Sequence, residues 1–249
     1  MSVRIAILSA IEWEVKPLVE SWERRPFQIG TAKVPSFRRE DTIVACVGMG
    51  PAAAQRGAKA VIASLQPQVV ISTGFAGALQ ADLAVGDIVT PACVVEAATG
   101  RRYQAFRGHG TVVSSPRVAG AAEKRALARL YDAQAVDMEA AAVAKVAQEH
   151  GVRFMAVKAI TDPLDFPMVD FSRFTDSSGK LRWGRLLPFA TSRPALWPKL
   201  MRLAANSSRA SLELCRALTH LIEEQGIVHH QEREAASPNS VNALEQRLH

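Results

Sequence analysis

The chain has 249 residues, 48% of them hydrophobic and 22% charged, which is an ordinary globular composition with ample material for a core. Its formal net charge of +6 would suit nucleic acid or an anionic membrane surface, but the basic residues are mostly scattered, so we expect no nucleic-acid partner. No apolar stretch reaches the ~18 residues of a membrane span, and the three cysteines form no CxxC pair. We therefore expect a soluble, cytoplasmic protein.

Apolar runs and helical patterns alternate through the first half of the chain. Residues 3–9 are predicted to form a buried strand, rather than a signal peptide, and the helix that follows contains Glu14. Further along, the pattern predicts a strand pair at 35–39 and 41–47, a helix at 52–65, and a buried strand at 68–73 that ends in a glycine turn.

The second half continues the alternation. It predicts a β segment at 88–96, a polar loop at 101–110, a strand at 110–114 and a helix within 116–130. Residues 135–165 then supply a short extended piece, an alanine-rich helix and another buried strand. This order predicts an α/β fold: a single three-layer domain with a central mixed, largely parallel twisted sheet flanked by helices.

The composition changes after Asp165. Residues 166–193 combine four phenylalanines with prolines and glycines, and 194–221 are predicted to form one long amphipathic helix. We assign residues 1–222 to the domain, with 166–222 as its aromatic and basic segment and C-terminal helix. Residues 223–249 are polar and are predicted to be a disordered tail.

Two acids and two glycine turns are expected at one edge of the predicted sheet. The turns follow Val47 and Thr73, and the acids are Glu139 and Asp162. Ligands of such sheets bind outside the carboxyl ends of the strands. Each acid also has a local explanation: Glu139 as a first-turn helix charge, and Asp162 as an N-cap with Pro163 at the first helical position.

Other chemical patterns are weak. Residues 48–53 match GxGxxA, but the acid expected about twenty residues on in a dinucleotide site is missing, so a tight turn that packs helix on sheet explains them equally well. Residues 72–77 could be a plain turn, and Glu14 could lie on a solvated helix face. The six histidines have no ligand spacing, so we expect no metal.

Taken together, five segments resemble successive motifs of the nucleoside phosphorylase/nucleosidase superfamily, in particular its methylthioadenosine/S-adenosylhomocysteine nucleosidase-like members. They are SAIEWEV at 9–15, TGFAG at 73–77, VGDIV at 85–89, VDMEAAA at 136–142 and KAITDPLD at 158–165. They appear in the family's order across about two-thirds of the chain.

The resemblance implies cleavage of the N-glycosidic bond of a purine nucleoside, adenine being the expected base. Asp162 matches the family's general acid toward purine N7, and Glu14 matches the acid that activates water. Met138 and Glu139 match the ribose-binding pair. The remaining substrate-binding residues implied are Thr73, Gly74, Phe75, Ala76, Gly77 and Thr161. No cofactor is implied, although phosphate would be a co-substrate of a phosphorylase, and homo-oligomers are common in the family.

The sequence also departs from the family. The phosphate loop of the phosphorylases has no clear counterpart in residues 9–15, which with Glu14 favours water over phosphate as nucleophile. The aromatic residue that stacks on the base in the nucleosidases is missing from residues 115–118. A non-enzymatic nucleoside-binding protein on the same fold is the main alternative, and a dinucleotide-dependent oxidoreductase is a weaker one.

The later part of the chain resembles a narrower branch, the hopanoid-associated phosphorylases. The segments concerned are 176–185, 192–198 and 206–210. This resemblance implies adenosylhopane as substrate and a role in hopanoid biosynthesis. The aromatic and basic residues between Phe166 and Arg209 would then form an apolar funnel or a peripheral membrane contact, while an ordinary core helix with a subunit interface is the alternative.

Overall fold

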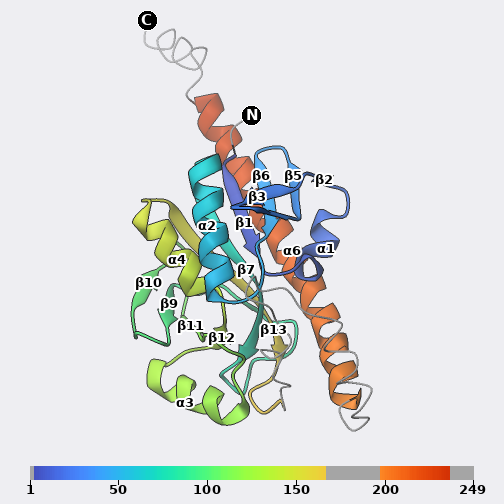
Figure 1. Ribbon diagram of the computed structural model, residues 1–249, viewed down its shortest axis with the longest axis vertical. Helices are drawn as coiled ribbons and strands as arrows, with labels where there is room; N and C mark the ends of the chain where they lie inside the picture. Colours follow the sequence, from blue (N-terminus) through green and yellow to red (C-terminus); the bar gives the residue numbers. More distant parts are fainter. Residues whose placement is uncertain (1–2, 167–196, 236–249) are drawn as a thin grey trace, which may run out of the picture.

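The computed structural model describes residues 3–166 and 197–235, and Figure 1 shows their arrangement. One sheet contains eleven strands: β1 (Ile5–Ser9), β2 (Glu23–Arg24), β5 (Ser36–Arg39), β6 (Thr42–Cys46), β7 (Val69–Ala78), β8 (Ile88–Val89), β9 (Cys93–Glu96), β10 (Arg102–Gln104), β11 (Thr111–Ser114), β12 (Ala135–Asp137) and β13 (Arg153–Asp162). A separate hairpin pairs β3 (Phe27–Ile29) with β4 (Ala32–Val34).

The centre of the sheet is parallel and its margins are antiparallel. β1 pairs in parallel with β6 and β7, and β13 pairs in parallel with β7. β9, β11 and β12 form a second parallel group that joins β7 through an antiparallel contact with β12. The predicted mixed, largely parallel sheet is therefore confirmed.

Helices cover both faces of this sheet (Figure 1). α2 (Pro51–Leu65) and α4 (Ala140–Glu149) bury alanine and valine side chains against one face. α1 (Glu12–Val19) and α6 (Trp197–Ala235) bury Val15, Leu18, Leu214 and Leu218 against the other. α3 (Ala121–Tyr131) packs over the β11–β12 end through Leu127. Apolar residues at helical spacing produce the three predicted layers.

Strand β7 differs from its prediction in a way that matters for function. It does not end at Thr73 but runs on through the glycine segment to Ala78. β13 pairs with this extension on one side and β12 on the other, so its backbone groups are bonded and no turn forms. Smaller differences are that 88–96 splits into β8 and β9, and that the predicted loop 101–110 contains β10.

The C-terminal helix is longer than predicted. α6 continues to Ala235, so residues 223–235, assigned to a disordered tail, are helical; this stretch is rich in Glu and Gln, which favour helix. The aromatic residues Phe171, Phe174, Trp183 and Phe189 lie outside the described residues, as does the tail from residue 236. No helix in the described parts of the chain is long and apolar enough to cross a membrane.

Candidate functional site

Glu14 lies at the start of α1 with its carboxylate directed into the protein. The side chain is 6% exposed, so the alternative of a solvated helix face does not hold. Its Oε2 accepts hydrogen bonds from Ser9 Oγ (2.5 Å) and from the backbone N–H groups of Ala10 (2.9 Å) and Ile11 (3.3 Å). Oε1 accepts one, from the backbone N–H of Phe75 at 3.3 Å. Because Oε2 is saturated and Oε1 is not, Oε1 is the oxygen that can accept a proton from a ligand.

Burial raises the pKa of Glu14 above its ordinary value, although the Ser9 hydrogen bond and the Lys158 charge oppose the rise. Desolvation disfavours the charged form of a carboxyl group, which makes the carboxylate a stronger base. A buried carboxylate with one oxygen open to a ligand is suited to removing a proton.

Glu139 is the N-cap residue of α4, but its side chain makes no capping hydrogen bond. Its Oε1 accepts a hydrogen bond from the backbone N–H of Gly50, at the N-terminus of α2, over 2.7 Å. The side chain that accepts from the first turn of α4 is Asp137, whose Oδ2 accepts from the backbone N–H of Ala140 at 2.8 Å. Glu139 thus has a partner outside its own helix in addition to its favourable place at the helix N-terminus. Its carboxylate also occupies the N–H that a phosphate would use in a dinucleotide site.

A buried ion pair supports this acidic cluster. Lys158 Nζ lies 2.7 Å from Asp137 Oδ2, and neither side chain is exposed to solvent. Burial alone would lower the pKa of Lys158, but the charges of Asp137, Glu139 and Glu14 outweigh it and raise that pKa. Burial also raises the pKa of Glu139 to about 7, despite the opposing charge of Lys158. One lysine thus partly neutralises three acids.

Two glycines of β7 make room for the two predicted catalytic acids. A Cβ at Gly74 would lie 2.8 Å from Glu14 Oε1, and a Cβ at Gly77 would lie 2.7 Å from Asp162 Oδ2. Both carboxylates therefore touch the same strand, three residues apart, which is about 10 Å of extended chain. The strand therefore connects the positions of the two acids.

Asp162 is the last residue of β13, and the segment after it is a turn and not the helix that its predicted N-cap role requires. Its Oδ1 accepts a hydrogen bond from Thr161 Oγ1 at 2.8 Å. Its Oδ2 forms an ion pair with Lys124 of α3, whose side chain is 1% exposed. Lys124 Nζ also donates to the backbone oxygens of Asp162 (3.2 Å) and Pro163 (2.9 Å).

The other predicted residues lie along β7 and β13 and directly after β12. Thr73 Oγ1 donates to the backbone oxygen of Val157 at 3.1 Å, which places it in the sheet as a buried structural contact. Ala76 offers its backbone oxygen to Thr161 Oγ1 at 3.4 Å. The Met138 Cε atom lies 4.0 Å from the position of a Gly50 Cβ, so Met138 adjoins the Glu139–Gly50 contact.

Sequence reasoning missed four residues that organise this site: Ser9, Lys124, Asp137 and Lys158. Three of them lie within the quoted motifs, but nothing in the motif letters shows which side chains pair. The available signal for Lys124 is its position on α3, where it and Leu127 are the buried residues of an otherwise solvated helix. A lysine at a core-facing helical position needs a buried partner.

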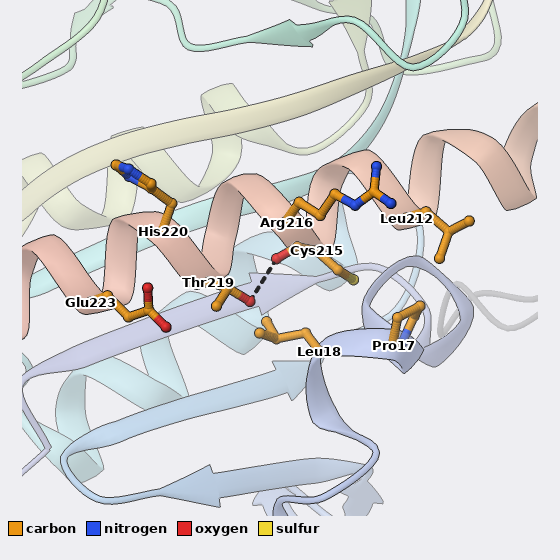
Figure 2. Close-up of a pocket in the computed structure, with 8 residues that line it drawn as sticks. All are labelled: Pro17, Leu18, Leu212, Cys215, Arg216, Thr219, His220 and Glu223. Carbon is orange, nitrogen blue, oxygen red and sulfur yellow. Dashed lines mark hydrogen bonds between the residues drawn. The ribbon is translucent and has the colours of Figure 1, made fainter.

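A separate groove of about 410 Å³ lies between α1 and α6, with Leu18, Leu212, Cys215 and Thr219 among its lining residues (Figure 2). None of the candidate acids lines it. Figure 2 shows Arg216, His220 and Glu223 leaving α6 in different directions, with no convergence on one point. The candidate site is thus the carboxylate cluster at β7. Among residues 3–166 and 197–235, no group of His, Cys, Asp or Glu is arranged to hold a metal.

The comparisons with known proteins agree with this fold. The family model described as "Phosphorylase superfamily" matches residues 4–124 and 92–180. The structure also resembles the 5′-methylthioadenosine/S-adenosyl homocysteine nucleosidase of Helicobacter pylori, with a TM-score of 0.68, 18% identity, and coverage of 90% of this chain and 100% of that one.

Two further solved structures are similar to the same degree. Futalosine hydrolase of Helicobacter pylori has a TM-score of 0.68 and 18% identity, over 90% of this chain and 99% of that one. The 5′-methylthioadenosine nucleosidase of Arabidopsis thaliana has a TM-score of 0.68 and 18% identity, over 90% of this chain and 96% of that one. At these identities the likeness establishes the fold.

Proposed function

Because the chain belongs to the phosphorylase superfamily, we propose that it cleaves the N-glycosidic bond of a purine nucleoside. The observation that carries this proposal is the placement of Glu14 and Asp162 against Gly74 and Gly77 of one strand, with Glu139 beside them. Asp162 protonates the leaving base at N7, Glu14 takes a proton from the nucleophile, and Glu139 with Met138 holds the ribose hydroxyls. Base and acid on opposite sides of a sugar carbon is the arrangement that glycosyl cleavage requires.

Water is the proposed nucleophile. The cluster contains Glu14, Glu139 and Asp137, and its lysine, Lys158, is already paired with Asp137 at 2.7 Å. A phosphate dianion would meet this negative field, and the Gly50 N–H that could bind it already donates to Glu139. Water carries no charge and needs only the open Oε1 of Glu14. Hydrolysis is therefore favoured over phosphorolysis.

The test is release of free base from adenosine, inosine, 5′-methylthioadenosine and adenosylhopane, with and without phosphate. We expect adenine release without phosphate. Asp162→Asn and Glu14→Gln should each lower kcat/KM by about 10²–10⁴-fold, the usual worth of one acid or base. Asp165→Asn is the matched control, because Asp165 is exposed and follows in the next turn. Binding of a nucleoside without any release would instead identify a non-enzymatic binding protein, and strict phosphate dependence would identify a phosphorylase.

The proposed substrate carries an apolar group at its 5′ carbon, as adenosylhopane does; a methylthioadenosine-type nucleoside is the second candidate. Asn206 Nδ2 of α6 donates to the backbone oxygen of Thr161 at 2.9 Å, so this part of the helix adjoins the Asp162 strand end. Trp197 and Met201, 52% and 69% exposed, lie within about 14 Å along the same helix. The apolar surface proposed to receive the 5′ group is made by these exposed side chains, on the turns of α6 that precede Asn206.

The same exposed turns of α6 support a peripheral membrane contact. Trp197 and Met201 are accompanied by Lys199 and Arg202, a mixture suited to the interface of an anionic bilayer. The protein should sediment with anionic liposomes. The double variant Trp197→Ser with Met201→Ser should stay in the supernatant. Equal binding to neutral liposomes, or no binding at all, would refute the proposed membrane contact and would have no bearing on the proposed reaction.

A further inference from the structure

Lys124 is a fully buried cation in an unusual place. It projects from α3, a helix whose other residues, apart from Leu127, are at least partly exposed. Burying an ammonium group costs several kcal/mol unless its protons are satisfied. All three N–H donors of Lys124 have partners here, namely Asp162 Oδ2 and the backbone oxygens of Asp162 and Pro163. α3 therefore positions the ammonium group of Lys124 at the end of β13.

The surroundings are shaped for this contact. A Cβ at Gly77 would lie 2.8 Å from Lys124 Cε and 2.7 Å from Asp162 Oδ2, so only glycine leaves room for the pair. Oδ1 of Asp162 is held separately by Thr161 Oγ1. Each carboxylate oxygen thus has its own donor, and the carboxylate is fixed in one orientation.

This arrangement raises a chemical question about the proposed reaction. Both oxygens of Asp162 already accept hydrogen bonds, Oδ1 from Thr161 and Oδ2 from the Lys124 ammonium group, so the leaving base has to draw its proton through one of these contacts. The proton must reach it from a neighbour. Lys124 is the neighbour that has one, and because both side chains are buried, the ion pair and the neutral lysine–carboxylic acid pair become closer in free energy.

We propose that Lys124 is the positioning residue of Asp162 and the source of the proton that Asp162 transfers to the purine; this inference rests on the proposed function. Lys124 transfers a proton to Asp162 Oδ2, and Asp162 passes that proton to N7 as the bond between C1′ and N9 breaks and its electron pair moves onto the base. Water adds its oxygen to C1′ and gives a proton to Glu14. Glu14 then returns a proton to solvent and Lys124 regains one, which restores the resting state.

The test compares two leaving groups. A purine nucleoside needs protonation of its base, whereas a para-nitrophenyl riboside releases a stable phenolate that needs none. Lys124→Met should lower kcat/KM for the purine nucleoside by about 10²–10⁴-fold and change turnover of the nitrophenyl riboside by less than about threefold. Lys124→Arg keeps the charge but cannot give up a proton, so it should fold and remain slow on the purine nucleoside.

Arg125→Met is the matched control, because Arg125 also ties α3 to the turn after β13, through Asp165, yet is half exposed. It should leave both substrates unaffected. If Lys124→Met does not fold, the double variant with Asp162→Asn removes both charges and should match Asp162→Asn alone on both substrates, since residues that act as a unit are not additive.

Equal losses on both substrates, full purine activity in Lys124→Arg, or a double variant below Asp162→Asn would overturn the inference and leave a purely structural lysine. Failure of the wild-type protein to release base from any nucleoside would instead refute the proposed function, so the two failures are distinguishable.

Discussion

Asp137 and Lys158 form an ion pair with no solvent exposure, in which Oδ2 and Nζ are 2.7 Å apart. Asp137 accepts a hydrogen bond from the first turn of α4 and Lys158 lies in the middle of β13, so the pair joins a helix N-terminus to the central sheet. Glu139 and Glu14 both lie within the electrostatic reach of this lysine. The pair therefore supports the fold and the acidic site together.

Lys158→Met should destabilise the protein by about 3–5 kcal/mol, because it leaves Asp137 buried without a counter-charge. The double variant Lys158→Met with Asp137→Asn should recover part of that loss, since asparagine also caps helices, while Glu14 and Glu139 remain without the charge of the lysine. Urea denaturation measures both. Arg216→Met, which breaks the exposed pair with Glu213, is the control and should cost about 0–1 kcal/mol. A double variant no more stable than Lys158→Met would contradict this account.

Glu139 should make stability depend on pH. Burial raises its pKa from 4.5 to about 7, so between these values the unfolded chain has released a proton that the folded protein retains. The contribution of Glu139 to the free energy of unfolding is therefore fully present below pH 4.5. It falls as pH rises through about 7, by at most about 3 kcal/mol in total. Urea midpoints of the wild type and Glu139→Gln at pH 5 and pH 8 measure it. The decline should be smaller in Glu139→Gln, and parallel declines would disprove the assignment.

Gly77→Ala should impair activity through steric contact with the site. Its Cβ would lie under 3.0 Å from Asp162 Oδ2 and Lys124 Cε, so both side chains must shift. A displacement near 1 Å at a reacting group costs about 10²-fold in rate. Gly120→Ala is the control, because no atom lies within 4 Å of that Cβ. Steady-state kinetics of both variants, with thermal melts, separate loss of activity from loss of fold.

The cysteines should be unreactive in the folded protein. Cys46, Cys93 and Cys215 are free and buried. Burial raises the pKa of Cys46 to about 12 and raises that of Cys215, so neither thiol is ionised near neutral pH. An aromatic disulfide reagent should label none of the three in buffer and all three in denaturant. Rapid labelling of the native protein would show that this core opens.

The layered fold and the location of the site followed from local pattern. Buried strands such as residues 3–9 and helices such as 52–65 can be recognised from the hydrophobic pattern, which depends only on nearby residues. Glu139 and Asp162 could be singled out because both were expected at the ends of predicted strands, and a parallel sheet gathers such positions on one edge. Glu14 was singled out only by the family resemblance. The chemical roles of these acids were implied only by the resemblance to the nucleoside phosphorylase/nucleosidase superfamily, since each acid also had a local explanation.

The continuation of β7 through Gly74–Gly77 could not be read locally, because glycines usually end strands and only pairing with β12 and β13 keeps this segment extended. The same holds for the contacts that define the site. Gly50 and Glu139 are 89 residues apart in the chain, and Lys124 and Asp162 are 38 apart. Periodicity specifies which face of an element is buried, whereas the partner of a buried charge depends on which distant element packs there, and that is decided by tertiary structure alone.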